Sequence, residues 1–128
     1  MKKSTYLQPE VPRLGDLTLD QKIAQMLLVG FRGFTLDSDN PIIKDLKDQH
    51  VGGIILFDYD VVLKSYERNI KSPEQLSILM QQIYSHMGMA TFVSIDQEGG
   101  TVNRLKPEYG FEATRTHVEL GRIDDTNE

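Results

Sequence analysis

Residues 91–104, TFVSIDQEGGTVNR, decide the fold of this chain. The first part, 91–95, is a short apolar run of the kind that forms a buried strand. The second part holds two carboxylates, two glycines and an arginine. Polar groups that directly follow a parallel strand lie where open and barrel-shaped α/β folds bind their ligands. The stretch therefore predicts a strand that ends at the rim of a binding site.

Two apolar runs upstream, 26–31 and 51–57, predict two more buried strands. Before the first run and between the predicted strands, apolar residues recur at helical spacing, which predicts helices over 19–25, from Pro41 to about Gln49, and from Pro73 to about Met87. The helix starts carry capping residues, namely Thr18 with Gln21, Asn40 before Pro41, and Ser72 before Pro73 with Gln75. Alternating apolar strands and helices are typical of parallel βαβ units, so we predict an α/β fold.

The ends of the chain lack this pattern. Residues 1–16 contain Pro9, Pro12 and Gly15 without periodicity, which predicts an irregular amino-terminal arm. Beyond Arg104 the chain is rich in turn residues and poor in apolar ones. We therefore divide the chain into an arm, 1–16, and one domain, 17–128.

Composition narrows the classes of partner and compartment. The 128 residues carry a formal net charge of -5, which disfavours a nucleic-acid or anionic-membrane partner. There is no cysteine, so disulfides and thiolate chemistry are excluded. No apolar segment follows Met1-Lys2-Lys3, so the chain as written has no signal peptide, and no segment approaches a membrane helix. These features fit a cytoplasmic protein, or a secreted one whose signal peptide has been removed.

Asp96 and Glu98 are the first candidate site residues. Two carboxylates can act as acid and base in glycoside hydrolysis, or one can bind hydroxyls while the other accepts structural hydrogen bonds. Solvated loop charges without a role are the third reading. Arg104 lies close enough in sequence to pair with Asp96 or with a substrate oxygen. Gly99 and Gly100 make a tight turn or let the backbone approach a ligand, and the turn is the simpler reading.

Other polar residues carry less chemistry. Asp58 and Asp60 follow the second strand but lack further ligands at calcium-loop spacing. His50, His86 and His117 are dispersed and form no zinc motif. We therefore expect no metal and no cofactor.

Four motifs follow one another along the chain: LTLDQKIAQM (17–26), HVGGIILF (50–57), NIKSPEQL (69–76) and IDQEGG (95–100) followed by Val102 and Arg104. Together they resemble the amino-terminal part of glycoside hydrolase family 3. The Asp-Gln-Glu-Gly-Gly form is similar to that of the β-N-acetylhexosaminidase branch rather than that of the β-glucosidases. The resemblance runs from about Leu17 to Gly121. One position departs from it, because Thr101 stands where the family usually has a basic residue.

The resemblance implies a (β/α)8 barrel of the TIM type, of which this chain supplies about three of eight strands. It implies that Asp96 hydrogen-bonds the hydroxyls of a terminal N-acetylglucosamine and that Arg104 binds the same sugar. Glu98, Gly99 and Gly100 are then expected to shape the loop. The resemblance further implies that the carbohydrate substrate of the intact protein is a β-linked N-acetylglucosamine at the end of a peptidoglycan fragment or chitooligosaccharide.

The resemblance places no catalytic residue in this chain. In family members the nucleophilic aspartate and the His-Asp acid/base pair lie past the position that matches Glu128. Asp96 and Glu98 share one short loop, whereas the carboxyl groups of a retaining glycosidase flank the bond that is cleaved. We therefore expect a fragment of an enzyme that is inactive alone. The alternative is a stand-alone, non-catalytic module that binds sugar or self-associates through exposed strand edges.

Overall fold

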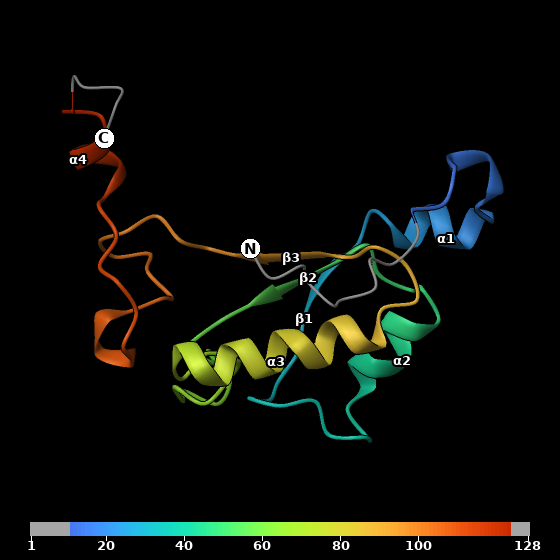
Figure 1. Cartoon of the computed structure of the whole chain (residues 1–128), viewed down its shortest axis with the longest axis horizontal. Coiled ribbons are helices and arrows are strands. Elements are labelled where there is room, and N and C mark those ends of the chain that lie inside the picture. Colours follow the sequence, from blue (N-terminus) through green and yellow to red (C-terminus); the bar gives the residue numbers. More distant parts are fainter. Residues whose placement is uncertain (1–10, 124–128) are drawn as a thin grey trace, which may run out of the picture.

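The computed structural model describes residues 11–123 and contains one parallel sheet of three strands (Figure 1). The strands are β1 (Leu28–Gly30), β2 (Gly53–Leu56) and β3 (Phe92–Ile95), and they pair in the order β1-β2-β3. The register pairs Leu28 with Gly53 and Gly53 with Phe92. Each strand thus lies beside its predecessor in the chain. The predicted parallel α/β fold is confirmed.

The helix before the first strand and the two helices between the strands begin at the predicted caps. Helix α1 (Leu19–Ala24) has the full capping box, α2 (Pro41–Lys47) is capped by the Asn40 side chain, and α3 (Pro73–His86) is capped by Ser72. These short polar side chains accept hydrogen bonds from the first free N–H groups of each helix. The remaining helical elements are η1 (Leu14–Asp16), η2 (Pro107–Tyr109) and α4 (His117–Leu120).

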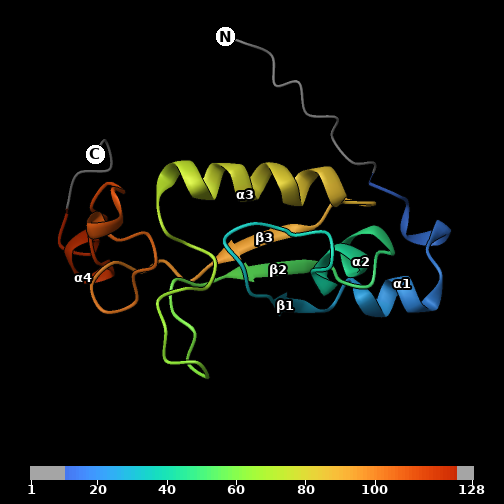
Figure 2. The ribbon, with the colours of Figure 1, turned by 90° about the horizontal axis from the view of Figure 1, so that it is seen from below.

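Helices α2 and α3 lie on the same side of the sheet and form the core with it (Figures 1 and 2). On the sheet, Ile54 and Leu56 are almost completely buried. The helices contribute apolar side chains that are equally buried, among them Ile42, Leu46, Leu79 and Ile83. Consecutive right-handed crossovers place both helices on one face, because the strands follow each other in the same direction.

The opposite face of the sheet is open in the part of the chain that the structure describes. Leu28 of β1 and Phe92 of β3 are the register partners of Gly53 on the central strand. On this face Phe92 is 81% exposed and Leu28 is 52% exposed. The prediction that these apolar strands are buried was therefore wrong for β1 and β3. Hydropathy shows that a strand has two apolar faces, but not whether both faces are covered.

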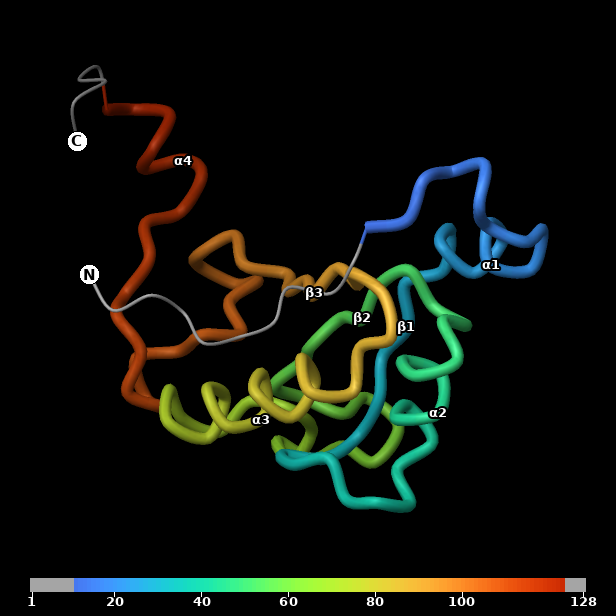
Figure 3. The backbone as a smooth tube through the Cα atoms, turned by 45° about the vertical axis from the view of Figure 1, so that its right-hand side comes forward, coloured from blue at the N-terminus to red at the C-terminus, as the bar shows by residue number. Residues whose placement is uncertain are grey.

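The chain leaves the sheet after β3 and runs to the end of the molecule opposite α1 (Figures 1 and 3). This segment holds η2 and α4, which the sequence analysis did not predict. Of the predicted arm, residues 1–10 lie outside the described residues, and 11–16 contain the single turn of η1. Residues 124–128 also lie outside. Within residues 11–123, no helix combines the length and apolarity needed to cross a membrane.

Candidate functional site

Charged residues follow the carboxyl end of each of the three strands. Arg32 follows β1, Asp58 and Asp60 follow β2, and Asp96 follows β3. Parallel strands end at the same edge of a sheet, so residues that are far apart in sequence meet there. This is the edge at which the sequence analysis placed the binding site.

Asp96 and Arg104 lie together, as their spacing suggested. Asp96 Oδ2 is 4.0 Å from Arg104 Nη2, and the two side chains are 49% and 25% exposed. At 4.0 Å the pair attracts electrostatically but makes no hydrogen bond, since a donor–acceptor distance of about 3.6 Å or more is too long for one. Asp96 therefore keeps accepting capacity toward solvent, and Arg104 presents a donor beside it.

Arg104 is held from behind by Asp58, a residue for which the sequence analysis found no role. The Asp58 side chain is fully buried. Its Oδ1 accepts a hydrogen bond from Arg104 Nη1 at 3.4 Å, and its Oδ2 accepts one from Lys106 Nζ at 2.5 Å and one from Tyr109 Oη at 3.4 Å. A buried carboxylate requires such partners, because the loss of hydration is otherwise too costly. The signal in the sequence was its place directly after the central strand.

The charge of Asp58 changes the titration of its neighbours. Burial by itself would lower the pKa of Lys106, but the hydrogen bond and charge of Asp58 outweigh this and raise the pKa above its ordinary value. Burial also raises the pKa of the Tyr109 phenol. Both groups therefore stay protonated and act as donors at neutral pH.

Gln97 positions the backbone of the same segment. Its Oε1 accepts from the N–H groups of Arg104 and Leu105 at 2.9 and 3.0 Å, and its Nε2 donates to Asn103 Oδ1 and Thr114 Oγ1 at 2.7 and 2.8 Å. All four partners of the Gln97 side chain belong to the segment that follows β3. The sequence analysis missed this role, since an amide between two carboxylates carries no spacing signal.

The predicted loop-shaping residues form a narrow turn. Glu98 N donates to Val102 O at 2.8 Å, and Gly99 and Val102 form an antiparallel bridge. Gly99 and Gly100 have φ values of 72° and 58°, in the left-handed region that favours glycine. The Glu98 residue is exposed. The turn brings the chain back from Asp96 toward Arg104, and a role for the Glu98 side chain stays a prediction.

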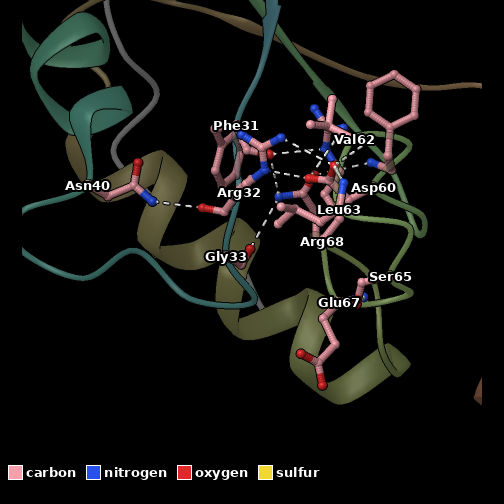
Figure 4. Close-up of polar contacts among 12 residues, drawn as sticks. Phe31, Arg32, Gly33, Asn40, Asp60, Val62, Leu63, Ser65, Glu67 and Arg68 are labelled. Carbon is pink, nitrogen blue, oxygen red and sulfur yellow. Dashed lines mark hydrogen bonds and ion pairs between the residues drawn. The ribbon is translucent and has the colours of Figure 1, made fainter.

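Asp60 anchors the long loop that follows β2 (Figure 4). Its buried carboxylate pairs with Arg32, and its Oδ1 accepts from the N–H groups of Val62 and Leu63 at 3.0 Å each. The hydrogen bond from Arg32 is the main cause that lowers the pKa of Asp60 to about 2. Arg68 adds a second cation, whose Nη1 lies 3.9 Å from Asp60 Oδ2. The loop is therefore fixed at its base across the end of β1.

Asn69 closes this arrangement. Its Nδ2 donates to the carbonyl oxygens of Phe31 and Gly33, and its Oδ1 accepts from Phe57 N, each at 3.2 Å. Asn69 is fully buried, so these bonds tie the ends of β1 and β2 together. Within the described residues 11–123, no three acidic or histidine side chains cluster to hold a metal ion.

The fold and this edge define the class of protein: an α/β domain of parallel, consecutively ordered strands whose polar site lies at the carboxyl ends. The chain belongs to glycosyl hydrolase family 3, because the model of the family's N terminal domain matches residues 18–117. This confirms the family resemblance of the four motifs.

Two curated relatives are named beta-hexosaminidase. A beta-hexosaminidase of Nitrosomonas eutropha is 34% identical over 101 residues, which cover 79% of this chain and 25% of the relative. A beta-hexosaminidase of Alkalilimnicola ehrlichii is 35% identical over 80 residues, which cover 62% of this chain and 20% of the relative. The chain thus spans about a quarter or less of the curated relatives it matches.

A solved structure is similar to this chain. The glycoside hydrolase family 3 beta-N-acetylglucosaminidase from Paenibacillus sp. str. FPU-7 matches with a TM-score of 0.62 and 36% sequence identity. The match covers 87% of this chain and 19% of the solved chain. The three strands therefore correspond to part of a TIM-type barrel, as predicted.

Proposed function

We propose that this chain supplies the sugar-binding edge of a β-N-acetylglucosaminidase that removes terminal β-linked N-acetylglucosamine from oligosaccharides such as peptidoglycan fragments or chitooligosaccharides. The observation that carries the proposal is the pair of Asp96 and Arg104 at the end of β3. The names of the relatives supply the substrate class.

In this proposal Asp96 accepts hydrogen bonds from sugar hydroxyls, and Arg104 donates to sugar oxygens. Charged partners make such bonds stronger than neutral ones, and a planar guanidinium offers donors in a fixed direction. The half-exposed Asp96 carboxylate and the partly exposed Arg104 guanidinium present both kinds of group on one side.

We further propose that the nucleophile and the acid/base lie outside these 128 residues. Asp96 is half-exposed and faces the Arg104 cation, an arrangement that suits a binding group. Glu98 lies on the same turn, not across a sugar from Asp96. A retaining glycosidase needs its two carboxyl groups about 5–5.5 Å apart with the scissile bond between them.

A titration of the purified chain with N-acetylglucosamine, followed by protein NMR, tests the binding role. We expect shifts at residues 96–104, and Asp96→Asn or Arg104→Gln should weaken binding about tenfold or more, since each removes a charged hydrogen bond. Asp48→Asn is the matched control, because Asp48 is exposed and ends α2 at the opposite edge of the sheet. Unchanged affinity in both site variants would contradict the proposal.

Hydrolysis of an aryl N-acetyl-β-glucosaminide tests the placement of catalysis. The purified chain should release no aryl alcohol above the buffer rate. Activity that is present in the wild-type chain and is lost in Asp96→Ala would show that these residues do carry catalysis.

A second candidate function is self-association through the open sheet. Phe92 and Leu28 expose apolar surface beside strand edges that are unpaired within residues 11–123, which favours pairing with another chain. We expect the mass measured by analytical ultracentrifugation to rise with concentration, and Phe92→Ser to reduce this rise. A monomer at all concentrations would exclude it.

A further inference from the structure

The three donors that reach Asp58 all come from one segment. Arg104, Lys106 and Tyr109 follow the turn after β3, whereas Asp58 follows β2. The carboxylate is therefore the point at which this segment is fastened to the central strand. Its complete burial leaves it no water to pair with from the surface.

Asp58 and Asp96 hold opposite ends of the Arg104 guanidinium. Nη1 lies 3.4 Å from the buried Asp58 Oδ1, and Nη2 lies 4.0 Å from the half-exposed Asp96 Oδ2. Only the first of these is a hydrogen bond. The direction of the guanidinium plane is thus set by the buried carboxylate and not by the exposed one.

The remaining contacts of Arg104 do not engage all of its donors. Its Nε atom is buried and has no hydrogen-bond partner among the described residues. The guanidinium carbon lies 5.7 Å from the centre of the Phe57 ring, which supports the plane without accepting its N–H groups. Lys106 shares Asp58 with Arg104, so one carboxylate faces two cations.

We propose that Asp58 is a positioning residue, which orients Arg104 so that its outer N–H groups meet the sugar beside Asp96. The proposal rests on the proposed sugar-binding function and extends it to a residue that does not touch the sugar. Without the Asp58 carboxylate, the Arg104 guanidinium loses the only hydrogen bond that it makes among the described residues. The guanidinium can then turn toward Asp96. The guanidinium would then pair with the group that should accept from the substrate.

The test compares Asp58→Asn with Arg104→Gln and with the double variant. Affinity for N-acetylglucosamine is measured by NMR titration, and the Nε–Hε signal of Arg104 reports its orientation. We expect Asp58→Asn to weaken binding about tenfold or more, to shift the Arg104 signal and to speed its exchange with water. If Asp58 acts through Arg104, the double variant should bind no more weakly than Arg104→Gln alone.

A merely structural role of Asp58 would give a different pattern. Asp58→Asn would then lower the melting temperature and leave the affinity and the Arg104 signal unchanged, which would overturn the proposal. Additive losses in the double variant would overturn it as well. Lack of sugar binding by the wild-type chain would refute the proposed function, while the Arg104 signal would still test the role of Asp58.

Lys106→Met keeps the test open if Asp58→Asn does not fold. This variant removes the second cation and leaves the carboxylate to Arg104 and Tyr109. The Arg104 signal should stay protected from exchange, and the loss of affinity should be smaller than that of Arg104→Gln. If Lys106→Met lost as much affinity as Arg104→Gln, and the Arg104 Nε–Hε proton exchanged freely with water, Lys106 and not Asp58 would position Arg104.

Discussion

Substitution of the two glycines in the turn after β3 tests how this turn places Arg104. Both have positive φ values, 72° for Gly99 and 58° for Gly100, but their surroundings differ. A Cβ atom on Gly99 would lie 2.5 Å from the backbone oxygen of Arg115, whereas on Gly100 it would lie 3.0 Å from a methyl group of Thr116. A side-chain methyl can rotate away, but a backbone oxygen moves only with its segment.

The expected cost follows from these two terms. Alanine in the left-handed region costs about 1–2 kcal/mol, and the stiffer unfolded chain returns about 0.4–1 kcal/mol. Gly100→Ala should therefore destabilise the protein by about 1 kcal/mol. Gly99→Ala adds the displacement of backbone, which costs about 1–3 kcal/mol for a tightly packed position. Its total should be about 2–4 kcal/mol.

Urea unfolding followed by circular dichroism measures both values against wild type, and thermal unfolding should show the same order. For a domain of this size 1 kcal/mol corresponds to a shift of about 3–5 °C in melting temperature. We also expect Gly99→Ala to weaken sugar binding more than Gly100→Ala, because the turn leads to Arg104. Equal stability of the two variants would refute the reasoning from the Arg115 contact.

Three further predictions concern the anchor, the core and a cap. Asp60→Asn should destabilise the protein at neutral pH, because Arg32 lowers the pKa of Asp60 to about 2. The difference in unfolding free energy between the variant and wild type should persist above about pH 5. It should shrink as the pH falls from about 4 to 2, where the wild-type carboxylate becomes protonated. A difference that is independent of pH across this range would exclude the ion pair as its cause. Leu79→Ala should lower the free energy of unfolding in urea by about 2–5 kcal/mol, since Leu79 is 0% exposed. Ile78→Ala on the same helix should lower it far less, because Ile78 is 52% exposed. Similar losses in the two variants would contradict the packing of α3. Ser72→Ala should lower the free energy of unfolding by about 0.5–2 kcal/mol, because α3 loses its cap, and Ser72→Asp should restore most of this stability. An unchanged melting temperature in Ser72→Ala would show that the cap contributes nothing.

Local patterns in the sequence predicted most of the secondary structure. The capping residues and apolar periodicity located α1, α2 and α3 to within a few residues, because these signals act over one or two helical turns. The short helix α4 escaped prediction, although it too has a capping box at Thr116. A four-residue helix carries too few apolar positions to show a period.

The sequence by itself determined the parallel α/β order and the family, and it offered Asp96, eight positions before Arg104, as one of two possible partners of that arginine. Only the tertiary structure decided what holds that pair. Arg104 and Asp58 are 46 positions apart, and Arg32 and Asp60 are 28 apart, so no local pattern links them. They meet because parallel strands bring their carboxyl ends to one edge, where buried carboxylates must find cations. Which face of the sheet stays open was also decided by the tertiary structure, since hydropathy marks apolar side chains but not the surfaces that cover them.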